Sequence, residues 1–115
     1  MQNIKSDVFA ALKRALPGNG KVFFVTPDKD ADLPCISYLE LNNIPSTDAD
    51  DDEYTSDIEM SVDIWGDTGP EELSEIMLRV DNELKAIGGR RTYCTDIPQD
   101  ADHVYHKNMR YDFFK

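Results

Sequence analysis

The sequence predicts an α+β domain in which an antiparallel or mixed sheet of about four to five strands carries two helices on one face. The strongest signal is residues 57–65, where polar and apolar side chains alternate as in a strand with one buried and one wet face. At Gly66 the apolar period changes from two to 3.6, and residues 70–87 carry a one-sided apolar stripe. The predicted element order is α-β-β-β-α-β-β, without the βαβ alternation of parallel sheets. These features together indicate a helix layer packed on one side of the sheet.

The first part of the chain predicts one helix and two strands. Residues 3–16 place five apolar side chains on one helical face, namely Ile4, Val8, Phe9, Leu12 and Leu16. Residues 17–20, with one proline and two glycines, end this helix. Residues 21–26 are β-branched and aromatic, which favours a short strand. Residues 35–41 predict a second strand, with Pro34 at its entry, where a missing N–H does least harm.

The middle of the chain predicts a polar loop, a strand and the second helix. Residues 42–54 are expected to form a mobile loop, because they contain an acidic run whose like charges repel one another. The acidic members of the run are Asp48, Asp50, Asp51, Asp52 and Glu53. Residues 55–65 form the predicted third strand. The second helix covers residues 70–87, with Pro70 in its first turn and the glycine pair 88–89 after its last.

Two further strands are predicted at residues 91–95 and 105–113. The core should join the strand residues Ile58, Met60, Val62 and Ile64 to the helix residues Leu73, Ile76, Met77, Val80 and Leu84. The polar face of the sheet should collect Asp57, Glu59, Ser61, Asp63, His106, Asn108, Arg110 and Asp112. Trp65 has the parity of this polar face. We expect its ring to fold over the core edge at the strand–helix corner, the alternative being an exposed interface anchor.

The chain of 115 residues is long enough for one core and is expected to form a single domain over residues 1–115. Its net charge of −11 is uneven: residues 1–47 hold five basic and five acidic side chains, and residues 48–115 hold seven basic and eighteen acidic ones. So negative a surface repels nucleic acid, whose binding depends on Lys and Arg, and it also disfavours anionic membranes. Docking to a basic partner stays open.

No segment has the roughly 20 apolar residues that a membrane helix needs, and no signal-peptide pattern is visible. A cytoplasmic location in the producing cell is therefore expected. In that compartment Cys35 and Cys94 would remain reduced thiols.

Two groups of residues have some features of a metal site, and neither is assigned as one. Asp48, Asp50, Asp52 and Glu59 occupy positions one, three, five and twelve of a calcium loop, but Glu53 stands where that loop needs glycine. His103, His106, Cys35 and Cys94 lack the paired spacing of a structural zinc site. We expect the acidic residues of the first group to lie in a solvated loop and the histidines of the second group to lie on the surface.

No catalytic or cofactor-binding residue is assigned either. No Ser or Cys lies on a glycine-rich turn, and Gly18-Asn19-Gly20 follows a helix, whereas a phosphate loop opens one. Arg90 and Arg91 follow a helix C-terminus, where basic side chains more often complement the helix dipole than clasp a phosphate. We therefore expect a protein that is not an enzyme and needs no cofactor.

The chain contains a set of weak motifs in a characteristic order. They are an amphipathic helix at 4–16, a strand at 21–25, the entry Leu33-Pro34-Cys35-Ile36-Ser37-Tyr38, a polar loop, the strand end Val62-Asp63-Ile64-Trp65, an amphipathic helix at 70–87, and the closing Tyr111-Asp112-Phe113. This ordered set resembles the bacteriophage tail completion, or tail terminator, family, which includes minor tail protein U-like neck proteins. The resemblance covers nearly the whole chain.

The resemblance implies a structural role in a phage or prophage virion. Members of that family are small α+β subunits that form a ring, commonly a hexamer, on the completed tail tube. The implied partners are other copies of the chain, the tail tube protein and the head–tail connector protein, and the implied location is the virion tail or neck, with assembly in the bacterial cytoplasm. The acidic run is the candidate interaction loop. The alternative function is a small acidic module that binds a metal or a partner.

Overall fold

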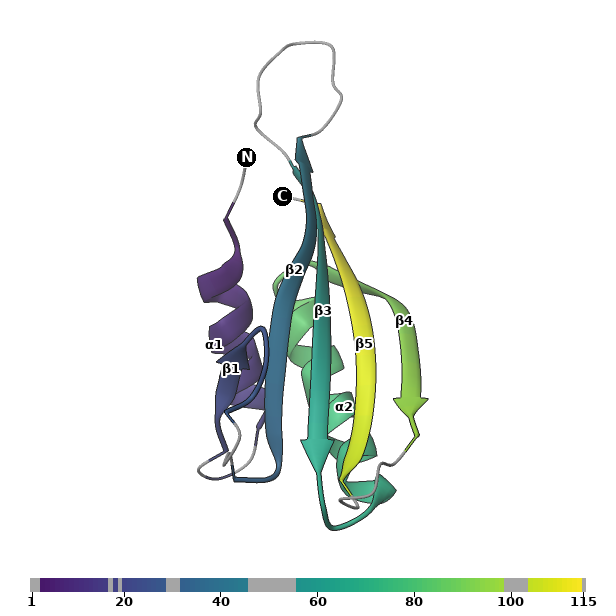
Figure 1. Ribbon diagram of the computed structural model, residues 1–115. Coiled ribbons are helices and arrows are strands. Elements are labelled where there is room, and N and C mark those ends of the chain that lie inside the picture. Colours follow the sequence, from purple (N-terminus) through teal and green to yellow (C-terminus); the bar gives the residue numbers. More distant parts are fainter. Residues whose placement is uncertain are drawn as a thin grey trace.

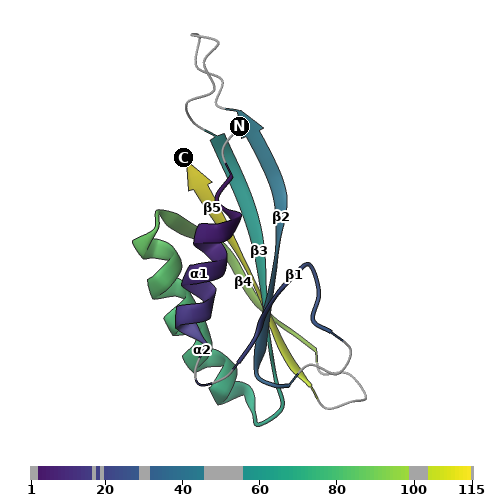
Figure 2. The ribbon, with the colours of Figure 1, turned by 90° about the vertical axis from the view of Figure 1, so that its left-hand side faces the viewer.

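Five strands form one mixed sheet, and both helices lie on the same side of it, which confirms the predicted fold class (Figures 1 and 2). The computed structural model describes residues 3–16, 18, 20–28, 32–45, 56–98 and 104–114. In chain order the elements are α1 (Lys5–Ala15), β1 (Val22–Phe24), β2 (Cys35–Pro45), β3 (Ser56–Gly66), α2 (Pro70–Ala86), β4 (Gly89–Ile97) and β5 (Tyr105–Phe114).

The strand order across the sheet is β1-β2-β3-β5-β4. β1 pairs with β2 in parallel, and all other neighbours pair antiparallel. Because β5 lies between β3 and β4, those two strands run in the same direction, and α2 provides the connection between them. Figure 2 shows α1 and α2 side by side in a layer that faces one side of the sheet.

The core lies between the sheet and the two helices, as the alternation in β3 predicts. Ile58, Met60, Val62 and Ile64 are all fully buried, and they belong to one cluster with Leu73, Ile76, Val80 and Leu84 of α2. Met77 is only partly buried at the edge of this cluster. From β5 the core receives Met109, Tyr111 and Phe113, and α1 adds Val8, Ala11 and Leu12. Burial of these apolar surfaces is the main source of stability for such a fold.

The strand bounds differ from the sequence prediction where pairing extends a strand. The predicted loop at 42–54 was wrong at its start, because β2 continues to Pro45 by pairing with β3 beyond a bulge at Leu41. β4 covers Gly89–Ile97, more than the predicted 91–95, because it pairs with nearly all of β5. β1 ends at Phe24, since Val25 has a φ of 75° that a strand does not accommodate.

Within the described part of the chain, no helix has the length and apolarity needed to cross a membrane. Cys35 in β2 and Cys94 in β4 are both free thiols. They lie three strand spacings apart, about 14 Å at about 4.8 Å per spacing, which is beyond disulfide reach. Burial raises the pKa of the Cys35 thiol to about 11, whereas Cys94 is exposed.

Candidate functional site on the polar face of the sheet

The face of the sheet that points away from the helices carries several hydrogen-bonded polar side chains. It carries the predicted polar residues of β3 and β5, which alternate with the buried ones along each strand. β2 adds Ser37 and β4 adds Arg90, Tyr93 and Thr95 at matching register positions. The prediction that β3 and β5 each have one core face and one polar face is therefore confirmed.

A hydrogen-bonded group, which we call the polar cluster, occupies one end of this face. It consists of Ser37, Ser61, Asp63, Trp65, His106 and Asn108. Asp63 Oδ1 accepts hydrogen bonds from His106 Nε2 at 2.7 Å and from Asn108 Nδ2 at 2.9 Å. Asn108 Nδ2 also donates to Ser61 Oγ at 2.9 Å. The interactions within the cluster hold its side chains in one arrangement.

Trp65 does not fold over the core edge, so that prediction was wrong. Its ring stacks on His106 with centroids 3.6 Å apart and planes 14° from parallel, and its indole N–H donates to Ser37 Oγ at 3.2 Å. Trp65 keeps the parity of the polar face, where it pairs in register with His106, and these two contacts hold its ring there.

His106 lies on the polar face, as expected, but it is not a freely solvated histidine. Its side chain is only 18% exposed and that of Asp63 17%. A histidine with the carboxylate that orients it makes up two of the three members of a hydrolytic triad. The hydroxyls of Ser37 and Ser61, however, accept hydrogen bonds from Trp65 and Asn108. Among the described hydrogen bonds, none joins the imidazole to a nucleophile.

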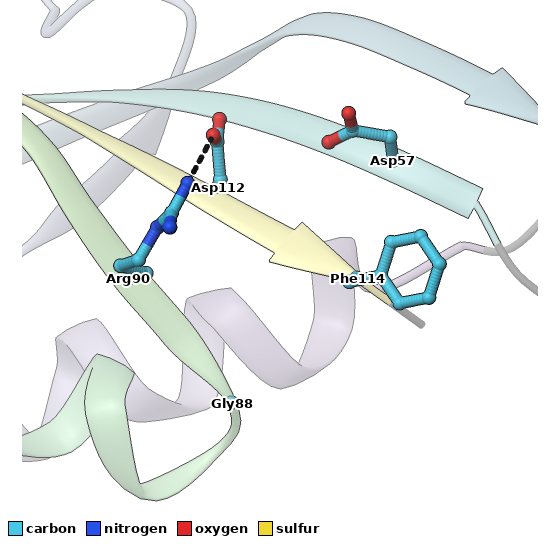
Figure 3. A pocket seen from close by; sticks show the side chains of 5 residues that line it. All are labelled: Asp57, Gly88, Arg90, Asp112 and Phe114. Atoms are coloured by element: carbon cyan, nitrogen blue, oxygen red, sulfur yellow. Dashed lines mark ion pairs between the residues drawn. The ribbon is translucent and has the colours of Figure 1, made fainter. Parts of the chain in front are cut away.

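The opposite end of the face is acidic and slightly hollowed, as Figure 3 shows. A hollow of about 350 Å³ is lined by Asp57, Gly88, Arg90, Asp112 and Phe114. An adjacent hollow of about 210 Å³ is lined by Asn42, Ile44, Asp57, Glu59 and Asp112. The two hollows together contain three carboxylates and one guanidinium, a net charge of −2 at neutral pH.

Arg90 and Arg91 do not act as a pair, which corrects the expectation that both complement the end of the preceding helix. Consecutive strand residues point to opposite faces. On the polar side, Arg90 Nη2 therefore lies 3.6 Å from Asp112 Oδ2. On the helix side, Arg91 Nε lies 3.9 Å from Asp81 Oδ1 of α2. Because they occupy different faces, they cannot hold one phosphate together.

The acidic run Asp48, Asp50, Asp51, Asp52 and Glu53 lies outside the described residues, and so does His103. Glu59, the twelfth position of the rejected calcium loop, is in the middle of β3 and pairs with Asn42 and Asp112. Within the described ranges, no group of three or more His, Cys, Asp or Glu side chains has the geometry to hold a metal ion.

Two features of the molecule were not predicted from the sequence. The Trp65–His106 stack depends on the register of β3 against β5, and alternation within one strand carries no information on register. The second feature is Asp81 on the buried side of α2, where it accepts a hydrogen bond from the Tyr111 hydroxyl at 2.8 Å. Its position within the apolar stripe of the helix was the available signal.

No protein-family model matches the chain, and no curated protein matches it.

Proposed function

We propose that this chain is a structural protein of a phage or prophage, which caps the completed tail tube as a ring and provides the joining surface for the head connector. The ring is formed by copies of the chain, most simply six, and its other partners are the tail tube protein and the connector protein. The site of action is the virion tail or neck, after assembly in the bacterial cytoplasm. No catalytic step belongs to this role.

The observation that supports the proposal most is the division of the sheet into two unlike faces. One face is buried under both helices, whereas the other is an ordered polar surface with hydrogen-bonded groups at one end and net negative charge at the other. A subunit that meets several partners in succession needs such a surface, because non-obligate interfaces are about as polar as the rest of a protein. The ordered motif set of the sequence supplies the specific link to tail completion.

The proposed role predicts a defect in tail length. Disruption of the gene in the phage or prophage that carries it should give tubes that continue past their normal end and stay unjoined to heads. Electron microscopy measures both, and supply of the intact gene in trans is the control. Tails of normal length that join heads in the disrupted strain would contradict the proposal.

The purified chain is expected to be a monomer or a loosely associated ring at micromolar concentration, and to order into a ring on a tube end. The alternative, a small acidic binder of a metal or partner, predicts a monomer whose thermal stability rises with calcium. Native mass spectrometry and thermal unfolding, with calcium and with chelator, separate these outcomes. Ring-sized assemblies whose mass does not change when the chelator is added support the tail role.

The acidic run is expected to act through its charge. Replacement of its five carboxylates by amides (Asp48→Asn, Asp50→Asn, Asp51→Asn, Asp52→Asn and Glu53→Gln) should leave the unfolding temperature nearly unchanged and alter how tail joining depends on salt. The reason is that attraction to Lys and Arg on a partner is screened over about 8 Å at physiological ionic strength. The yield of infectious particles across a salt series measures this. A yield equal to wild type at every salt concentration would limit the run to a role in solubility.

A further inference from the structure

An exposed apolar patch lies on the flank of the domain that α1 and β1 form, at the left in Figure 1. It consists of the exposed side chains of Phe9, Phe24 and Val25, and we call it the aromatic flank. The Phe24 ring meets the nearly buried Tyr38 ring edge-on with centroids 5.4 Å apart, and the Phe9 ring lies 6.5 Å from the Tyr38 ring. Apolar side chains that gather in one exposed patch mark interaction surfaces, whereas singly scattered ones do not.

The backbone at Val25, within this patch, is strained. Val25 has a φ of 75°, and Thr26 N–H donates to Phe24 O at 3.0 Å, which closes a γ-turn around Val25. A positive φ is a genuine outlier for a β-branched residue. Strained backbone of this kind persists where the surrounding structure fixes it, and it clusters at functional sites. Here the turn ends β1 and presents a valine side chain that is 51% exposed.

The opposite flank of the domain is formed by β4 and the side of α2 that faces it. α2 contacts β4 through Met77 and Asp81. Leu78 follows Met77 and lies about one turn before Asp81, so it is on the β4 side of α2, where its side chain is exposed. Glu71 and Glu75, also exposed, share the helix face of Leu78 at seven and three residues before it. We call Glu71, Glu75 and Leu78 the α2 flank.

The two flanks lie at the same level along the strands. One row of paired residues crosses the whole sheet, in the order Phe24–Tyr38–Val62–Met109–Cys94. At the end of this row Cys94 Sγ lies 3.6 Å from Met77 Sδ, beside Leu78. Phe24 on one flank and Leu78 on the other are therefore level. A head-to-tail contact between level surfaces needs no shift along the strands, which is a condition for a closed ring instead of a helical filament.

Charge favours a head-to-tail contact over a twofold one. Residues 3–28, which contain α1 and β1, hold four basic and two acidic side chains, a net charge of +2. α2 holds two basic and five acidic ones, a net charge of −3. Lys5 lies at the aromatic flank itself, with Nζ 5.3 Å from the centroid of the Phe24 ring. Unlike flanks therefore attract each other, whereas a flank that met its own copy would bring like charges together.

We infer that the aromatic flank binds a second copy of this chain: Phe24 and Val25 of one subunit pack on Leu78 of the next, and the basic side of the first subunit faces the acidic side of α2 in the second. The inference rests on the ring of the proposed function and names its subunit interface. Because the contact uses the flanks, the polar face of the sheet stays available to the tube and connector proteins. So small an apolar patch agrees with a ring that is loose in solution and ordered only on a tube.

Cysteine cross-linking tests this contact directly. In a Cys94→Ser background, Phe24→Cys combined with Leu78→Cys should give a ladder of covalent oligomers up to ring size under mild oxidation. Within one chain β1 and β4 are four strand spacings apart, about 19 Å, and Leu78 is on the β4 side, so a disulfide between the two positions joins two subunits. Cys35 is fully buried and stays in place. Absence of a ladder from a variant that still unfolds cooperatively would overturn the inference.

Matched controls accompany this variant. Each single cysteine variant should stay monomeric, and a dimer from Phe24→Cys or Leu78→Cys alone would mean a twofold contact and would overturn the inference. Phe24→Cys with Arg79→Cys should give at most a trace of ladder. Arg79 is exposed but lies about 100° further round α2, on the side where Glu83 pairs with Arg14 of α1. A ladder of equal yield from position 79 would show that Leu78 does not form the contact.

Substitution of Val25 separates assembly from folding. Asparagine accepts a positive φ more readily than valine, so Val25→Asn should not lower the unfolding temperature. It removes apolar surface from the aromatic flank, so it should lower the ring fraction in sedimentation velocity at least tenfold, and Leu78→Ser should do the same from the other flank. Ile44→Ser is the control, since it removes a similarly exposed apolar side chain from the polar face and should leave the ring fraction unchanged. Wild-type assembly of Val25→Asn and Leu78→Ser would contradict the inference.

The two proposals fail in different ways. A ring that forms without the cross-link between positions 24 and 78 removes this interface and leaves the tail role standing. A cross-linked ring, combined with normal tails in the gene disruption, keeps the interface and removes the tail role.

Discussion

Replacement of Val62 by aspartate is expected to lower the free energy of unfolding by several kcal/mol. Val62 is fully buried in β3, the central strand of the sheet, between Tyr38 of β2 and Met109 of β5. A carboxylate at this position would lose its hydration, and no described cation faces it in the core cluster. Small domains are stable by only about 5–15 kcal/mol, so a single buried charge takes a large share of that margin. Urea unfolding followed by circular dichroism measures the change.

Two variants test the cause of this loss. Leu78→Asp adds the same charge on the exposed side of α2, where Leu78 is 59% exposed, and should cost only about 0.5–1 kcal/mol. Val62→Ala removes two methyl groups without adding charge and should cost roughly 2 kcal/mol. If Val62→Asp unfolds at the same urea concentration as Leu78→Asp, the assignment of the core face is wrong.

Removal of the Asp81 carboxylate is expected to produce the second largest effect, a loss of about 1–3 kcal/mol in Asp81→Ala. Asp81 is 8% exposed and accepts hydrogen bonds from Tyr111 Oη and Lys85 Nζ, both at 2.8 Å. Tyr111 is fully buried in β5, so its hydroxyl has no access to water once its acceptor is removed. The contact therefore joins α2 to the sheet through a polar bond inside an apolar layer.

This contact also predicts a specific acid dependence. Burial alone would raise the pKa of Asp81, but the hydrogen bonds from Lys85 and Tyr111 and the charge of Arg91 outweigh it, so the pKa lies below its ordinary value. A carboxyl with a lowered pKa in the folded state stabilises the fold above its unfolded pKa of about 3.9. That stabilisation is lost as the pH falls through the lower, folded value. Asp81→Asn should therefore show a shallower loss of unfolding free energy than wild type below about pH 4.

A double-mutant cycle separates the hydrogen bond from the other roles of the two residues. Asp81→Ala and Tyr111→Phe should show a coupling energy of about 0.5–3 kcal/mol, because they contact each other directly. Glu83→Ala is the matched control on the same helix. Its surface ion pair with Arg14 of α1 should contribute less than about 1 kcal/mol. A coupling energy near zero would show that the buried bond does not contribute to stability.

Most of the secondary structure follows from local patterns in the sequence. The alternation in β3 and the 3.6-residue stripe in α2 predict both elements to within one residue at each end, because burial on one face imposes each period directly. The ends of β2 and β4 were predicted less well. Pairing across the sheet extends both strands past residues of weak β propensity, such as Asn42, Asn43 and Gly89, and propensity yields to the hydrogen bonds of a neighbouring strand.

The candidate site divides in the same way. Alternation assigns Asp63 and His106 to one face of the sheet, but it does not say that they meet at 2.7 Å, since that depends on the offset between β3 and β5. Trp65 shows the limit most clearly. Alternation along β3 gives the face on which Trp65 lies, but only the register places His106 and Ser37 where they hold its ring.

By itself, then, the sequence determined the α+β class, the two helices, the buried face of β3 and the charge asymmetry, because each of these depends on residue type and spacing along the chain. Tertiary structure alone decided the strand order, the polar cluster, and the separation of Arg90 from Arg91 across the sheet. Each of these depends on which strand lies beside which and at what offset. Strand order and register are set by contacts between residues far apart in sequence, which no local period encodes.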